Sequence, residues 1–186
     1  DLGSWIVTRE EFLAQVAARR SWEKVSVSNV DLRGAALSGA ALQGLRLFHA
    51  LLDGAVLTGA SLERASLQGV SLDHTVLHGV QWKDCAIERS SALGAQFGGE
   101  EITGLRLQQC ELRGVQFTVK KLHKVLFVGC KLQTASFRGI ELEEVLFEAC
   151  DLSHVDFQQA KLTKVVFNRC RSNRVLLQHA HVQQCA

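Results

Sequence analysis

The stretch 147-FEACDLSHVDFQQAKLTKVVFNRC-170 decides the fold. Phenylalanine returns every ten residues, at Phe147, Phe157 and Phe167, and leucine falls midway, at Leu152 and Leu162. A period of five fits neither an α-helix, in which every fifth residue is rotated by about 140°, nor a flat strand, in which every fifth residue changes face. The pattern therefore predicts a chain that turns a corner every five residues, with the marked side chains pointing inward.

The same period extends over most of the chain. Every fifth residue from Val27 to Phe167 is apolar, and Ser172 is the first polar residue in the series. The residue two places before each central residue is mostly small, and 13 of the 15 glycines fall two places after one. Four corners close a coil of 20 residues, and successive coils stack like strands, about 4.8 Å apart. Residues that are 20 apart are therefore predicted to lie directly above one another.

This pattern resembles the pentapeptide repeat family, whose motif reads roughly Ala-Asp/Asn-Leu-x-x. It appears here as VDLRG, AALSG, ASLQG, CDLSH and AKLTK, in one register from Val25 to about Ala186, although Asp or Asn is often missing from the second position. The resemblance implies an all-β solenoid, a right-handed quadrilateral β-helix of about eight coils of 20 residues.

The chain divides into two parts. Residues 1–24 are expected to form an N-terminal capping segment with an α-helix over about 9–20, in which Thr8 is the N-cap and Glu11 its capping-box partner. With Phe12, Trp5 and Trp22, this segment is predicted to cover the first coil, because an open coil exposes its core and its strand edges. Residues 25–186 are expected to form the β-helix.

An irregular stretch is predicted near 88–101. Ala92 is small for a central position, Glu100 is charged at a position that is normally small and inward, and Gly98 and Gly99 adjoin. These features predict a bulged corner rather than a domain boundary, because the period resumes in phase at Ile102.

The composition limits the classes of function. Lys and Arg number 21 against 19 Asp and Glu, for a net charge of +2, which favours neither a nucleic-acid-binding module nor an acidic mimic of nucleic acid. No run of 18 apolar residues predicts a membrane span. Proline and methionine are absent. The lack of proline indicates a backbone whose amide groups are committed to hydrogen bonds, and the lack of a starting methionine suggests a fragment of a longer chain.

The polar residues do not predict catalysis. Cys110, Cys130, Cys150 and Cys170 recur every 20 residues and should stack on one inward side as small buried side chains. Such a line does not converge on the tetrahedral site that zinc requires, and parallel side chains make a disulfide awkward. All seven histidines fall at outward positions, away from the cysteines. We therefore expect no enzyme, no metal site and no cofactor.

Two groups of outward residues are the candidate interaction surfaces. The first is an apolar strip in three successive coils, and contiguous exposed apolar residues usually mark a contact. It consists of Leu126, Val128, Leu146 and Val166. The second is a charged ladder of alternating sign, which either neutralises itself or docks a partner. It consists of Lys121, Lys124, Glu141, Glu143, Glu144, Lys161 and Lys164.

Three functions are compatible with this pattern. The first is a non-catalytic scaffold for protein–protein interaction, a cytoplasmic module of a larger bacterial protein, which resembles the repeat regions of type VI secretion accessory or adaptor proteins. The second is a DNA-mimicking topoisomerase-binding protein, as the family includes strongly acidic proteins that protect gyrase from quinolones. The third is the targeting domain of a secreted effector. The expected partner is another protein, or a second copy bound through the C-terminal end or the apolar strip, and neither nucleic acid nor membrane.

Overall fold

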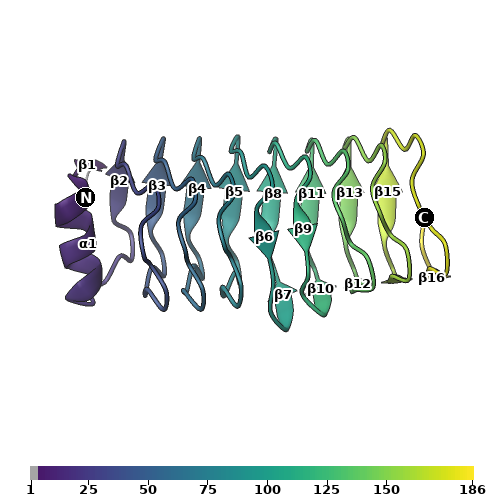
Figure 1. The fold of residues 1–186 in the computed structure, drawn as a ribbon, viewed down its shortest axis with the longest axis horizontal. Coiled ribbons are helices and arrows are strands. Elements are labelled where there is room, and N and C mark those ends of the chain that lie inside the picture. The colour runs from purple at the N-terminus through teal and green to yellow at the C-terminus, as the bar shows by residue number, and fades with distance from the viewer. Residues whose placement is uncertain (1–3) are drawn as a thin grey trace.

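The computed structural model describes residues 4–186, with the backbone alone for residues 4–6. The chain forms an elongated solenoid with one helix at its N-terminal end, and the two ends of the chain lie at opposite ends of the long axis (Figure 1). One side of the solenoid is a nine-stranded parallel sheet. In spatial order its strands are β1 (Ser4–Ile6), β2 (Ser26–Ser28), β3 (Arg46–Phe48), β4 (Ser66–Gln68), β5 (Ala86–Glu88), β8 (Arg106–Gln108), β11 (Leu126–Val128), β13 (Leu146–Glu148) and β15 (Val166–Asn168).

A second, adjacent side carries a five-stranded parallel sheet in the C-terminal half. Its strands are β7 (Glu101–Thr103), β10 (Lys121–His123), β12 (Glu141–Glu143), β14 (Lys161–Thr163) and β16 (His181–Gln183). A third side contains the two-stranded pair β6 (Gln96–Phe97) and β9 (Gln116–Phe117), and isolated parallel bridges complete the sides between coils. The predicted all-β solenoid is confirmed.

The register follows the predicted interval of 20 residues. Phe127 pairs with Phe147, and Phe147 with Phe167, each exactly one coil further along the chain. Parallel strands that pair in this way place identical positions of successive coils in rows along the axis. Every surface or core position therefore belongs to a row whose members are read directly from the residue numbers.

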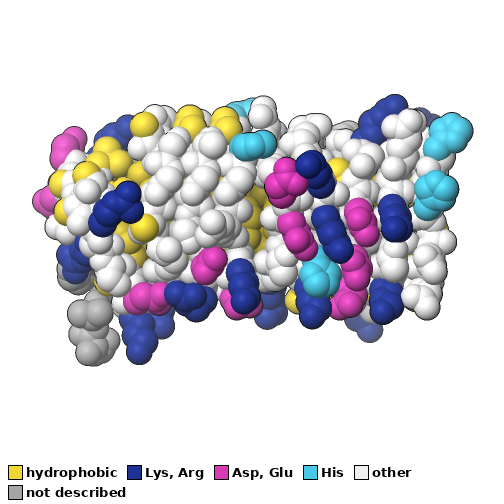
Figure 2. Space-filling model, turned by 90° about the horizontal axis from the view of Figure 1, so that it is seen from below, with side chains coloured by type: hydrophobic (Ala, Val, Ile, Leu, Met, Phe, Trp, Pro, Cys, Tyr) yellow, Lys and Arg dark blue, Asp and Glu magenta, His cyan; other side chains and the backbone are white. Residues whose placement is uncertain are grey.

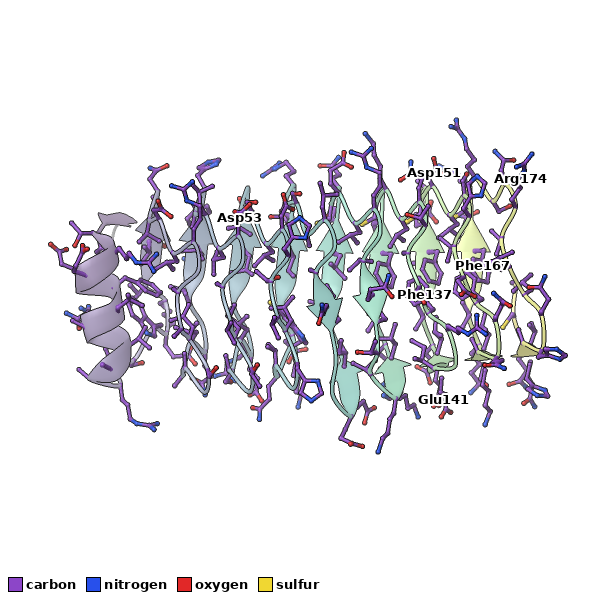
Figure 3. All side chains as sticks on the ribbon, viewed as in Figure 1. Asp53, Phe137, Glu141, Asp151, Phe167 and Arg174 are labelled. Atoms are coloured by element: carbon purple, nitrogen blue, oxygen red, sulfur yellow. The ribbon has the colours of Figure 1, made fainter. Side chains whose placement is uncertain are left out.

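Stacked aromatic rings fill the C-terminal half of the core. Phe117 stacks on Phe137 at 4.8 Å between ring centroids, and Phe127 stacks on Phe147 at 4.9 Å, on the facing side. Rings of the two stacks meet edge to face, as Phe137 and Phe147 do at 5.7 Å. Figure 3 shows Phe137 and Phe167 inside the solenoid, whereas Glu141 and Asp151 lie at its opposite edges. Stacked and edge-to-face geometries are both favourable for aromatic pairs.

The helix α1 (Arg9–Ala17) covers the first coil. The Thr8 hydroxyl accepts a hydrogen bond from the Glu11 amide at 3.1 Å, and buried Phe12 stacks on Trp22 at 4.8 Å. The helix ends three residues before the predicted residue 20, because Arg19 takes a left-handed backbone (φ 54°) and the Arg20 amide bonds back to the Gln15 carbonyl. The side chain of Trp5 lies outside the described residues.

The corner after β6 departs from the regular coil, inside the stretch expected to be irregular. Gly98 is buried and Glu100 is exposed, and β7 begins at the next residue. The same departure recurs one coil later, where Val119 is buried in place of Lys120. The charged residue of each corner therefore turns outward, and the next coil continues in phase. Among the described residues, no helix is long and apolar enough to cross a bilayer.

Candidate interaction surface

The apolar strip lies on the outer surface of the nine-stranded sheet, over β11, β13 and β15. Leu126 pairs with Leu146, and Leu146 with Val166, so these three side chains form one row along the axis. Val128 lies on the same strand as Leu126, in the neighbouring outward row. Leu126, Val128 and Leu146 are half-buried, and Val166 is 39% exposed. The structure therefore brings all four predicted residues together.

The strip is confined to the C-terminal half of the sheet. In the N-terminal half, the row that contains Leu126 carries small or charged side chains. These residues are Ser26, Arg46, Ser66, Ala86 and Arg106. The core beneath the sheet is continuous from end to end, so packing inside the coil does not require an apolar residue on the outside. The change from small or charged side chains to larger apolar ones along this row therefore concerns the outer surface and not the core.

The charged ladder lies on the adjacent five-stranded sheet. Lys121 pairs with Glu141, and Glu141 with Lys161, so opposite charges alternate along the row. Figure 2 shows this face from outside, with basic and acidic side chains interleaved over its C-terminal half and mostly uncharged side chains over its N-terminal half. An attraction between opposite charges on directly neighbouring strands stabilises a sheet by ~0.2–1 kcal/mol per pair.

The contacts within the ladder are partly diagonal. The Lys121 ammonium lies 2.5 Å from the Glu143 carboxylate, whereas Lys161 and Glu141 are 3.9 Å apart. The hydrogen bond with Lys121 lowers the pKa of the Glu143 carboxyl, and the same bond raises the pKa of the Lys121 amine. Both groups therefore stay charged across the neutral range, and the ladder presents fixed charges to a partner.

Lys124, Glu144 and Lys164 occupy the corner between the two sheets. Each takes a left-handed backbone conformation, with φ of 55°, 55° and 54°. Only this corner separates β10 from β11, and β12 from β13, so the ladder and the apolar strip are adjacent surfaces. An apolar centre with a charged border is the usual anatomy of a protein–protein interface.

Two residues of the ladder could contribute to a cation site. His123, Glu143 and Glu144 place one possible ligand atom each within 4.8 Å of one another. The Lys121 ammonium already occupies the position beside Glu143. A divalent cation would have to displace this ammonium and its charge, so the arrangement is better suited to an ion pair than to a metal.

The ladder extends further than the sequence analysis predicted. Glu100 and Lys120 form an ion pair at 2.9 Å, and Glu101 lies 3.8 Å from His123, which carries the alternation back to β7. The sequence did contain an indication of this extension, since Glu100 and Lys120 are one coil apart and opposite in charge. It was missed because both positions are inward in a regular coil, and only the altered corner turns them outward.

The C-terminal coil is the other apolar surface. The side chains that would face the core of a following coil are open to solvent, with Leu177 50% and Val182 61% exposed. They line a hollow of about 740 Å³ together with Phe157, Leu162 and Phe167. This end and the apolar strip lie close to one another, since Val166 and Phe167 are neighbours in β15.

Comparisons with known proteins agree with this architecture. The sequence model of the pentapeptide repeats matches eight copies, over residues 42–80 and 130–169. The structure is similar to that of HetL, a pentapeptide repeat protein involved in heterocyst differentiation regulation in the cyanobacterium Nostoc, at 19% identity and a TM-score of 0.51 over 94% of each chain. It is also similar to QnrB1, a plasmid-mediated fluoroquinolone resistance protein, at 16% identity and a TM-score of 0.55, over 97% of this chain and 93% of that one.

At these identities the likeness concerns the fold alone. A search of curated protein sequences found no match.

Proposed function

Because the pentapeptide repeat model matches residues 42–80 and 130–169 and the fold is that of a repeat solenoid, we propose that this chain is a non-catalytic docking module, which binds another protein through the C-terminal half of the solenoid. The apolar strip would form the centre of the interface and the charged ladder its border. The observation that carries the proposal is the row Leu126, Leu146 and Val166, which is apolar and outward where the same row is small or charged in the preceding coils.

The solenoid supports this role through its shape. Its interior is filled by stacked Leu and Phe side chains, and the geometry that repeats from one coil to the next leaves regular, flat outer faces. A rigid sheet that is already ordered loses little conformational freedom when a partner binds, which is the main advantage of a preorganised surface.

The test is a pair of substitutions in one row of the nine-stranded sheet. Leu146→Glu places a charge in the centre of the strip, and Ser66→Glu places the same charge on the same sheet, four coils closer to the N-terminus. A photo-crosslinking amino acid is introduced at Val128 in cells of the source organism, and covalent adducts are identified by mass spectrometry.

We expect adducts with defined partners that are lost with Leu146→Glu and kept with Ser66→Glu. Equal adduct formation by the two variants would contradict the proposal. Sedimentation of the purified chain then distinguishes a second copy of this chain from a different protein as the occupant. Membership of a type VI secretion apparatus is a narrower form of this proposal, whereas a targeting domain of a secreted effector is an alternative to it, and the identity of the adduct decides between them.

The charges argue against the DNA-mimicking alternative. A protein that mimics DNA needs a continuous negative surface. Here Glu100 and Glu143 are paired with Lys120 and Lys121, and the net charge of the chain is +2. At 16% identity, the similarity to QnrB1 concerns the fold alone. Inhibition of gyrase supercoiling at low concentrations of this protein would reverse the order of the two proposals.

A further inference from the structure

Four cysteines form a row along one corner of the solenoid, between the nine-stranded sheet and the side that carries Asp151. Cys110, Cys130, Cys150 and Cys170, called the thiol row below, each follow a strand of that sheet by two residues. The strands pair in register, so the sulfurs occur once per coil on neighbouring rungs. The rungs of parallel strands are about 4.8 Å apart.

The side chains of the row are oriented alike. The Cys130 thiol donates to the Leu107 carbonyl at 3.4 Å, and the Cys150 thiol donates to the Phe127 carbonyl at 3.3 Å. Cys110 and Cys170 make the equivalent bonds to the carbonyl 23 residues earlier, at 3.4 and 3.2 Å. A repeated contact of this kind fixes the same rotamer on every rung, so the sulfurs lie on a line parallel to the axis.

The strand register places the thiols of neighbouring rungs next to one another. Contact with Cys130 lowers the pKa of the Cys110 and Cys150 thiols, and the same two contacts raise the pKa of Cys130. Cys85 differs, since burial alone raises the pKa of its thiol, and its neighbours one coil away are Ala65 and Leu105. The thiols of the row therefore have other thiols on the neighbouring rungs, whereas Cys85 has none there.

The row opens to solvent at its C-terminal end, at Cys170. Cys130, Cys150 and Cys170 border a groove of about 490 Å³ that runs along the corner, where Cys130 and Cys150 are buried beneath the surface and Cys170 is half-buried. The same groove is lined by the basic residues Lys131, Arg169 and Arg171 and by Asp151, whose carboxylate lies 3.9 Å from the Arg171 guanidinium. A small cation could enter here, and the basic side chains would offset negative charge that forms on the sulfurs.

We propose that adjacent thiols of this row bind a soft monovalent cation, of the Cu(I) or Ag(I) class, in linear two-coordinate geometry. With the zinc–thiolate distance of roughly 2.3 Å as a guide, two metal–thiolate bonds placed end to end span about 4.6 Å, which is close to the spacing of the rungs. Soft thiolate ligands select Cu(I) over harder cations. A line of sulfurs does not suit tetrahedral zinc, but it meets the requirement of a two-coordinate ion.

The charges of the bound state balance. Each ion displaces two thiol protons to solvent, so two thiolates and one monovalent cation carry a net charge of −1. Four thiols form at most two separate pairs, Cys110 with Cys130 and Cys150 with Cys170. We therefore expect up to two ions per chain, and no redox step is needed for binding.

The test compares two double variants that remove the same number of thiols. Cys110→Ala with Cys170→Ala leaves Cys130 and Cys150 on adjacent rungs. Cys130→Ala with Cys170→Ala leaves Cys110 and Cys150 two rungs apart. Alanine fits this position, because buried Ala50 occupies the same row, and any loss of folding would affect both variants.

Cu(I) is titrated anaerobically into the reduced chain in competition with bicinchoninate, and native mass spectrometry counts the bound ions. The adjacent-rung variant should bind one ion. Removing a residue that hydrogen-bonds to a metal ligand weakens metal affinity by about 10- to 100-fold. In the variant whose remaining thiols are two rungs apart, one of the two ligands itself is out of reach, so its affinity for Cu(I) should be at least ~100-fold weaker. Cys85→Ala should bind like the unmodified chain, and Zn(II) should not compete.

Three results would overturn the proposal. They are equal affinity of the two double variants, a loss of binding with Cys85→Ala, and no binding by the unmodified chain. If the unmodified chain instead loses free thiols in air and binds no Cu(I), the row is a site of oxidation and not of cation binding.

Discussion

At the residue scale, the turn of each coil depends on the residue two places after the central Leu or Phe. This residue takes a left-handed backbone in most corners, as Gly34 (φ 65°), Gly44 (φ 74°) and His154 (φ 60°) do. Glycine adopts this conformation without the steric cost that other residues meet, which is ~1–2 kcal/mol per residue. The glycines found by their spacing are therefore part of the coil geometry, and a non-glycine residue at such a corner indicates a position where the cost is tolerated.

Two glycine substitutions separate backbone strain from steric contact. A Cβ atom at Gly34 would meet no atom within 4 Å, whereas one at Gly44 would lie 2.9 Å from the Cα of Glu23. We expect Gly34→Ala to lower the free energy of unfolding by about 1 kcal/mol and Gly44→Ala to lower it by roughly 1–3 kcal/mol more, because the segment after the helix must shift. Urea denaturation measures both, and equal losses would contradict the assigned contact.

The carboxyl group of Asp31 provides a test by titration. It accepts hydrogen bonds from the Arg33 side chain at 2.9 Å and from the Arg33 amide at 3.1 Å, and these lower its pKa from 3.8 to about 2. Because the pKa of Asp31 is lower in the folded chain than in the unfolded chain, this carboxyl group stabilises the fold at pH values above its pKa in the unfolded chain. The contribution is lost as the pH falls through about 2. In Arg33→Gln, carboxyl-carbon NMR should show the pKa of Asp31 moving up towards 3.8, with Asp151 unchanged as the control. A midpoint that stays near 2 would assign the shift to the backbone amide.

At the element scale, the helix and the irregular corners show what the sequence could and could not predict. The sequence predicted Thr8 as the N-cap because Glu11 follows it by three positions, and helix capping depends on such local spacing. The second altered corner, which buries Val119 in place of Lys120, was not found. Phe117 and Leu122 are five positions apart in the sequence whether or not the corner between them is altered. The period of five therefore does not reveal the altered corner. The charge of Lys120 at a normally inward position was the only signal.

The same limit applies to the candidate surface. The rows of the apolar strip and the charged ladder follow from residue numbers alone, because coils repeat every 20 residues. The diagonal contact of Lys121 with Glu143 does not, since the register places Glu141 opposite Lys121. Which of two carboxylates an ammonium contacts depends on side-chain rotamers, and a repeat pattern carries no information on them.

Removal of the helix cap should loosen the capping segment. Thr8→Ala deletes the acceptor for the Glu11 amide, which leaves that donor to solvent at the start of α1. We expect a loss of about 1 kcal/mol in the free energy of unfolding, with the stacking of Phe12 on Trp22 retained. The change is measured by urea denaturation followed by tryptophan fluorescence. Thr8→Ser, which keeps the hydroxyl, is the matched control and should restore most of the loss.

At the scale of the whole molecule, each coil contacts only the coil before it and the coil after it. The free energy of unfolding is then close to the sum of the contributions of the single coils and of the contacts between neighbouring coils, as in other repeat proteins. The thiol row, the apolar strip and the charged ladder all lie in the C-terminal half and on adjacent sides or corners. A change to one of these C-terminal coils can therefore affect all three surfaces.

The position of a phenylalanine along the axis should decide how much it contributes. Phe137 is fully buried and stacks on Phe117 at 4.8 Å and on Phe157 at 5.1 Å, whereas Phe167 stacks only on Phe147 and is partly exposed. We expect Phe137→Ala to lower the free energy of unfolding by about 3–5 kcal/mol, because the cavity is enclosed on both sides. Phe167→Ala should lower it by less than half as much. Urea denaturation gives both values, and hydrogen exchange should show that Phe137→Ala exposes amides of coils on both sides, while Phe167→Ala affects residues after β13. Equal losses would mean that the solenoid unfolds as one unit in which end and interior coils are equivalent.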